Sequence, residues 1–121
     1  MARFRLARPA QTDLAGILAT SLERWGTEGQ RRYATILTTA MRVVANEPQG
    51  LFTRDRAQLQ TGLRSFHLRH VRADEPGATV RRPVHVIYYR VIQPGLVEVV
   101  RILHERMEPG RWLAAISDEE E

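Results

Sequence analysis

The chain has 121 residues, of which 43% are hydrophobic, enough for one domain with its own core. It contains no cysteine, which excludes a disulfide scaffold, a thiol nucleophile and a thiolate metal site. The formal net charge is +4, and all 18 basic residues are arginine. Because arginine suits carboxylates and phosphates, the charge indicates an acidic protein or a nucleic acid as partner, unless the arginines are only solvated surface charges.

No apolar run is long enough to cross a bilayer, and the arginine-rich start lacks the apolar centre of a signal peptide. We therefore expect a cytoplasmic protein that makes no membrane contact. Residues 117–121 are all acidic apart from Ser117. We expect one domain over residues 1–116, followed by this acidic tail, 117–121, in a disordered state.

The first third of the chain predicts one strand and two helices. Residues 3–8 alternate between polar and apolar, which is typical of a half-buried strand. From Pro9 onward apolar residues recur every three or four positions until Gly26. Thr27 and Gln30 have the spacing of a capping box, and a second apolar stripe follows as far as residues 46–48. Since the connection between the stripes is so short, we expect two antiparallel helices, a helical hairpin.

The second half predicts strands over residues 63–71, 83–92 and 96–103, which are rich in β-branched and aromatic residues. The last of them is apolar on both faces apart from Glu98 and Arg101, so we expect it inside the sheet. A short C-terminal helix is expected over residues 109–116. The predicted fold is α+β with the order β-α-α-β-β-β: a helical hairpin packed on one face of a small, mainly antiparallel twisted sheet. The opposite face is expected to be partly exposed.

Six short sequence motifs occur in order along nearly the whole chain. They are RPAQTDL (8–14), ERWG (23–26), NEP (46–48), GLRSF (62–66), VIYYRV (86–91) and RILHERMEP (101–109). Together they resemble the RelE/ParE superfamily of toxins from bacterial type II toxin–antitoxin modules, and most closely its ParE branch, which is known from plasmid stabilisation. Residues 67–82 form a longer segment than the compact hairpin usual in ParE-like proteins. This segment is either a solvated arm or an arm that contacts a partner.

The resemblance implies a function. ParE-like members inhibit DNA gyrase, a type II topoisomerase, without chemistry of their own, and a ParD-like antitoxin neutralises them. That antitoxin is a ribbon-helix-helix protein with a segment that folds on the toxin. We therefore expect a gyrase inhibitor with no cofactor, which contacts DNA within the gyrase complex. The alternatives are a RelE-like, ribosome-dependent mRNA interferase, or a degenerate member that only binds its antitoxin.

The mRNA interferase alternative needs a group that takes a proton, a group that returns it, and a cation near the phosphate. His104, between Arg101 and Arg106, is the candidate for this catalytic set. No tyrosine follows Arg106, and the N–H of Trp112 cannot act as a general acid or base. An endoribonuclease would therefore require that His104 and a histidine of another strand converge on one groove.

The antitoxin-binding hypothesis needs arginines for acidic side chains and apolar anchors. Its candidate residues lie in the motifs that carry the resemblance or just after them: Arg64, Arg90, Arg101, His104, Arg106, Met107, Arg111 and Trp112. Structural alternatives stay open, because Trp112 could dock the terminal helix on the sheet and Arg101 could pair with a nearby glutamate. No metal site is expected, because His67 and His70 are three apart in a strand and no carboxylate follows at ligand spacing.

Overall fold

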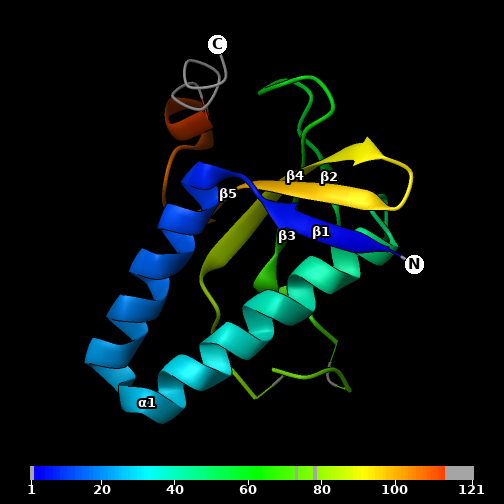
Figure 1. Cartoon of the computed structure of the whole chain (residues 1–121). Helices are drawn as coiled ribbons and strands as arrows, with labels where there is room; N and C mark the ends of the chain where they lie inside the picture. Colours follow the sequence, from blue (N-terminus) through cyan, green and yellow to red (C-terminus); the bar gives the residue numbers. More distant parts are fainter. Residues whose placement is uncertain (1, 73, 78, 114–121) are drawn as a thin grey trace.

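The computed structural model describes residues 2–72, 74–77 and 79–113. Figure 1 shows a bent helix against a twisted sheet. The elements in chain order are β1 (Arg3–Leu6), α1 (Arg8–Asn46), β2 (Arg54–Asp55), β3 (Arg64–His67), the 3-10 turn η1 (Leu68–His70), β4 (His85–Gln93) and β5 (Leu96–His104). A helical turn at residues 109–113 follows β5. The α+β class is confirmed.

The helix α1 is a single long element that bends sharply at Gly26 (Figure 1). Gly26 has φ 76° and ψ −174°, a conformation that is essentially restricted to glycine, and the helix resumes at the next residue. The chain breaks where the sequence predicts, but the expected helical hairpin is wrong. A hairpin needs a loop of about two to five residues, whereas here one residue leaves the helical conformation, and the two arms diverge.

The predicted capping box at Thr27 is also wrong, because Gln30 does not turn back to it. Instead, the Gln30 side-chain amide donates a hydrogen bond to the backbone carbonyl of Leu18, 3.1 Å away. This bond joins the second arm of α1 to the first arm across the bend. The side chain therefore fixes the angle between the arms rather than the start of a separate helix.

The sheet has five strands in the order β1-β5-β4-β3-β2. β1 runs parallel to β5, and the other three pairings are antiparallel, so the expectation of a mainly antiparallel sheet is confirmed. β5 lies between β1 and β4, as its two apolar faces predict. The predicted strand over 63–71 is shorter than expected, because the chain turns into η1 after His67, and the two-residue strand β2 was not predicted.

Each face of the sheet has its own apolar cluster. On the helix side, the second arm of α1 packs against residues of β3, β4 and β5, with Tyr89 fully buried among them. On the opposite face, Tyr88 packs in a smaller cluster that includes Leu113 of the terminal helical turn. The alternation of Tyr88 and Tyr89 places the two rings on opposite faces, so a tyrosine does enter the helix-side core, as expected. The terminal turn covers part of the second face and leaves the rest open.

The longer segment after β3 crosses the second arm of α1 rather than standing free in solvent. Val71 and Val80 pack against the helix-side core. Between them Gly77 has φ 89°, and a Cβ atom placed there would come within 2.6 Å of the Ile36 Cα atom. The segment is therefore not a solvated arm, because Gly77 permits a close backbone contact with α1.

The predicted C-terminal helix begins where expected, and its described part ends at Leu113. The remainder of that helix and the acidic tail, 117–121, lie outside the described residues. In the part of the chain that is described, no helix is long and apolar enough to cross a membrane.

Candidate functional site

The residues that follow β5 form an exposed surface. His104 ends the strand half-buried, and Arg106, Met107, Arg111 and Trp112 after it are exposed. For Met107 and Trp112 the exposed fractions are 41% and 39%, high for large apolar side chains. This part of the sequence-predicted set is available to a partner.

Arg101 is largely covered and is paired within the protein. Its guanidinium makes a bidentate pair with the Asp13 carboxylate, at 2.7 Å and 2.8 Å, and a third bond at 3.2 Å to the Trp112 carbonyl. The same carboxylate also accepts the backbone N–H of Ile102 at 2.9 Å. Both charged side chains are nearly buried, at 12% and 13% exposure. Arg101 therefore fixes the first arm of α1 to β5, with a partner that is 88 residues away in the sequence.

Two further arginines of the predicted set also hold the fold together. Arg64 donates hydrogen bonds to the Pro48 carbonyl and to the Thr53 hydroxyl, which ties β3 to the loop before β2. Arg90 donates twice to Glu98, at 3.1 Å and 2.8 Å, and Glu98 is buried. These contacts satisfy a buried carboxylate and a loop carbonyl, so they serve packing in the free protein.

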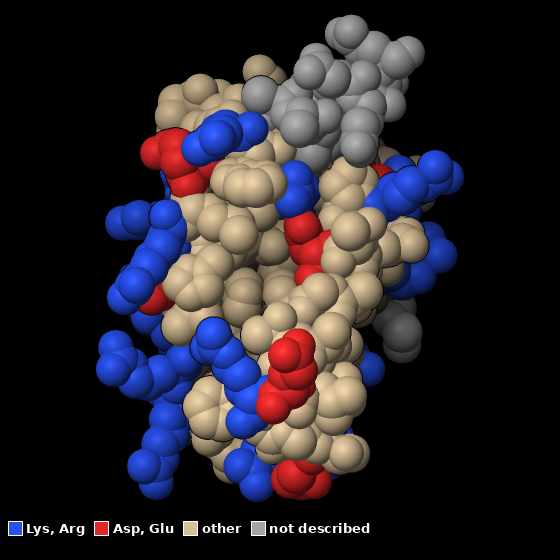
Figure 2. Space-filling model, turned by 90° about the vertical axis from the view of Figure 1, so that its left-hand side faces the viewer, with Lys and Arg blue, Asp and Glu red and all other residues tan. Residues whose placement is uncertain are grey.

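A groove runs between the first arm of α1 and the C-terminal end of β5, and we call it the α1–β5 groove. Its volume is about 710 Å³. The side of the molecule that carries the first arm is hollowed near its centre in the space-filling view, with arginines along the edges (Figure 2). Trp25, with 70% of its surface exposed, lines this groove together with Met107 and Trp112. The exposed apolar residues after β5 therefore belong to one larger surface with α1.

A histidine pair lies at the base of this groove. The Tyr33 hydroxyl accepts the Val84 N–H at 3.1 Å, and its oxygen also lies within hydrogen-bond distance of Nδ1 of His85, 2.6 Å away. Burial is the main cause that lowers the pKa of His85 to about 4, and the neighbouring His104 lowers it further. The His85 and His104 rings meet edge to face at 5.6 Å. His85 is therefore neutral at physiological pH and hydrogen-bonded to Tyr33.

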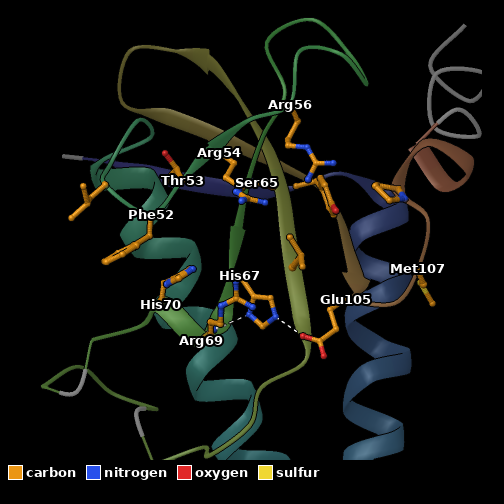
Figure 3. Close-up of a pocket in the computed structure, with 14 residues that line it drawn as sticks. Phe52, Thr53, Arg54, Arg56, Ser65, His67, Arg69, His70, Glu105 and Met107 are labelled. Carbon is orange, nitrogen blue, oxygen red and sulfur yellow. Dashed lines mark hydrogen bonds and ion pairs between the residues drawn. The ribbon is translucent and has the colours of Figure 1, made fainter.

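A second groove, on the sheet face away from α1, was not predicted from the sequence, and we call it the sheet-face groove (Figure 3). Its volume is about 650 Å³. Arginines 54, 56 and 69 line it, together with Phe52 and His70 on one side and Glu105 and Met107 on the other. The sequence signal that marks this groove is the pair of arginines in TRDR, residues 53–56, within a loop without periodicity.

His67 and Glu105 make the main polar contact in the sheet-face groove. Nε2 of His67 lies 2.7 Å from a Glu105 oxygen, and Nδ1 accepts the backbone N–H of Arg69 at 3.0 Å. Because Nδ1 is an acceptor, the proton of neutral His67 is on Nε2 and is donated to the carboxylate. This bond is the main reason why the pKa of Glu105 is lowered. Both nitrogens of His67 are thus occupied.

Part of the set expected for an mRNA interferase comes together, because His85 and His104 lie on neighbouring strands and both line the α1–β5 groove with Arg101, but these groups are engaged within the free protein. Arg101 is engaged by Asp13, and Nδ1 of His104 accepts the backbone N–H of Arg106 at 3.1 Å. The ring nearest to His104 belongs to His85, which is neutral and hydrogen-bonded to Tyr33. Among the described residues, no group of three or more His, Asp or Glu side chains is arranged to hold a metal ion.

Comparison with known proteins identifies the family. A family model described as the ParE toxin of type II toxin-antitoxin system, parDE, matches residues 4–109. The chain belongs to the ParE toxin family. The resemblance to ParE toxins that the six sequence motifs indicate is thereby confirmed. The ParE match includes both grooves up to Met107 and ends before Arg111 and Trp112.

Individual ParE relatives agree with this assignment. The chain is 32% identical over 108 residues to Toxin ParE1 of Caulobacter vibrioides, which covers 88% of this chain and 93% of the relative. It is 29% identical over 111 residues to Toxin ParE1 of Mycobacterium tuberculosis, which covers 92% and 97%. A structure of the chromosomal ParDE TA system from P. aeruginosa contains a chain with the same fold, with a TM-score of 0.60 at 18% identity, over 86% of this chain and 96% of that one.

Proposed function

We propose that this ParE-family toxin inhibits DNA gyrase and is neutralised by a ParD-like antitoxin of the ribbon-helix-helix class. The observation that carries the proposal is the family match over residues 4–109, which spans α1 and the whole sheet apart from Arg3. The proposal places the protein in the cytoplasm, where it meets gyrase and the DNA that gyrase holds. It requires no cofactor and no catalytic residue, since the toxin acts by binding.

The α1–β5 groove is the proposed site for the antitoxin segment. Trp25, Met107 and Trp112 supply exposed apolar anchors, and Arg24 and Arg82 also line the groove. A partly disordered segment with apolar and acidic residues would bury these anchors and pair with the arginines. Arg106 and Arg111, exposed beside the groove, extend the basic surface.

The target is tested with the purified protein in a gyrase supercoiling assay and, in parallel, in a translation assay with ribosomes. We expect loss of supercoiling with accumulated cleaved DNA, and intact mRNA. Cut mRNA together with normal supercoiling would overturn the proposed target in favour of an mRNA interferase. A protein that affects neither assay but binds its antitoxin would be a degenerate member.

The antitoxin site is tested by binding of the ParD-like protein that we expect to be encoded beside the toxin. Met107→Ala and Trp25→Ala should each weaken binding by about 5-fold or more, because each removes an apolar anchor. Val91→Ala is the matched control, since Val91 is similarly exposed, at 49%, but lies outside the groove. Equal losses in all three variants would exclude the α1–β5 groove as the specific site.

A further inference from the structure

The sheet-face groove is strongly basic, and its charge is not neutralised within the described part of the chain. Arg54 and Arg69 are exposed, and neither is within ion-pair distance of a described carboxylate. Arg56 lies over the Tyr88 ring at 5.7 Å, which holds it at the groove wall. Glu105 is the one acidic residue among the described lining residues, and His67 occupies it. The groove therefore presents three guanidinium groups to a ligand with several negative charges.

One side of the same groove offers a flat aromatic surface. The rings of Phe52 and His70 are stacked, with centroids 4.6 Å apart and planes inclined by 3° (Figure 3). About half of Phe52 is exposed, at 51%. An exposed ring beside arginines is the combination with which proteins bind single-stranded nucleic acid, because bases stack on the ring while phosphates pair with the cations.

We propose that the sheet-face groove binds single-stranded nucleic acid, with phosphates on Arg54, Arg56 and Arg69 and a base stacked on Phe52. Its volume, about 650 Å³, lies within the range of small-ligand sites, so it accepts a short stretch of one strand. A duplex is a poorer ligand, since its base faces are covered by neighbouring bases. An acidic peptide would pair with the arginines but would leave the Phe52 ring without a planar partner.

His67 and Tyr88 are titratable groups of this groove that are not available as bases toward such a strand. A general base needs a free lone pair, and in His67 one nitrogen accepts the Arg69 N–H while the other donates its proton to Glu105. Burial raises the pKa of Tyr88, so this phenol keeps its proton and cannot serve as a base either.

The test uses fluorescence anisotropy with the intact protein and a labelled single-stranded DNA about 12 nucleotides long, within the usual range of site sizes. With three phosphate contacts, the slope of log K against log salt should be about −2, since each contact in a single strand contributes about 0.7. Arg54→Ala and Arg69→Ala should each weaken binding and reduce this slope by about 0.7. The assay contains no gyrase, so its outcome is independent of the proposed target.

Phe52→Ala separates stacking from charge. It should weaken binding by about 5- to 100-fold and leave the salt slope unchanged, because base stacking involves no counterion release. Arg42→Ala is the matched control for the arginine variants, since Arg42 is exposed on α1, outside the groove. All of these side chains are exposed, and the thermal unfolding of each variant is compared with that of the parent protein to verify its fold.

Two results would overturn the proposal. An Arg42→Ala loss as large as that of Arg54→Ala would show that net charge alone attracts the strand. A poly-glutamate peptide that competes fully for the groove, with no effect of Phe52→Ala, would assign the groove to an acidic protein segment.

Discussion

At the scale of single residues, Asp13 accepts three hydrogen bonds at once, two from the Arg101 guanidinium and one from the Ile102 N–H. Loss of this carboxylate leaves a nearly buried guanidinium without its counter-charge, which is costly in a low-dielectric environment. We expect Asp13→Ala to lower the free energy of unfolding by about 3 kcal/mol, as measured by urea denaturation.

Asp74 provides a matched control for this prediction. It pairs with Arg72 at 3.5 Å, and both side chains are more than 70% exposed, so water screens their attraction. Asp74→Ala should change the free energy of unfolding by less than about 0.5 kcal/mol. If the two variants were equally stable, the Asp13 pair would not join α1 to β5 as the geometry indicates.

His85 predicts a pH dependence of stability. Its folded-state pKa, about 4, lies below the ordinary value of 6.5, so the unfolded chain binds a proton more readily than the folded protein. The stability due to neutral His85 is complete above about pH 6.5 and is lost as the pH falls towards 4. A shift of this size corresponds to about 2–3 kcal/mol, and urea unfolding at several pH values measures it.

The variant His85→Gln separates the contribution of His85 to stability from that of the carboxylates, which titrate in the same pH range. The glutamine amide, which has both a donor and an acceptor, retains a hydrogen-bond partner for the Tyr33 hydroxyl but takes up no proton. Between pH 6.5 and 4, the variant should lose less stability than the parent protein. Parallel pH profiles for the two proteins would show that His85 is not held neutral by the fold.

At the scale of secondary-structure elements, the bend of α1 depends on one backbone conformation. Gly26→Ala adds a Cβ that meets no atom within 4 Å, so any effect comes from its φ of 76° and ψ of −174°. We expect a loss of about 1–3 kcal/mol in the free energy of unfolding. Gly16→Ala is the control: Gly16 is helical and open, so alanine should stabilise α1 by about 0.5–1 kcal/mol. Stabilisation by both substitutions would contradict a bend enforced by Gly26.

The elements show what the sequence alone can and cannot predict. The strands β4 and β5 were expected because their apolar patterns record burial directly, and the break in α1 was expected because glycine ends a helical pattern. The angle at that break was missed, since it depends on Gln30 reaching Leu18 across the bend. The two-residue strand β2 has no pattern of its own and exists through its pairing with β3.

The candidate sites also include residues whose position the sequence predicts and residues whose position it does not. Exposure of Met107 and Trp112 follows from a stretch that leaves the sheet, so the sequence indicated that surface. Arg101 lines the same groove as these two residues, but the sequence does not show that its charge is paired, because its partner Asp13 is 88 residues away. The sheet-face groove is missed for a similar reason: its arginines come from β2, from the loop after it and from the 3-10 turn η1, which only the folded sheet brings together.

At the scale of the whole molecule, the net charge of +4 predicts how the protein meets an acidic antitoxin segment. Long-range attraction accelerates encounter, and salt screens it over about 10 Å at ordinary ionic strength. We therefore expect the association rate constant to fall about 10-fold or more from low to high salt, while the dissociation rate constant changes little. Stopped-flow mixing with the antitoxin measures the association rate constant.

Substitutions should separate these two rate constants. Arg106→Ala and Arg111→Ala remove exposed charge beside the α1–β5 groove, so they should slow association and reduce its salt dependence. Trp112→Ala removes an apolar anchor, so it should accelerate dissociation and leave the salt dependence unchanged. The reverse pattern would contradict this assignment. If Trp112→Ala slowed association and the arginine variants accelerated dissociation, the charges rather than the apolar side chains would form the buried contact.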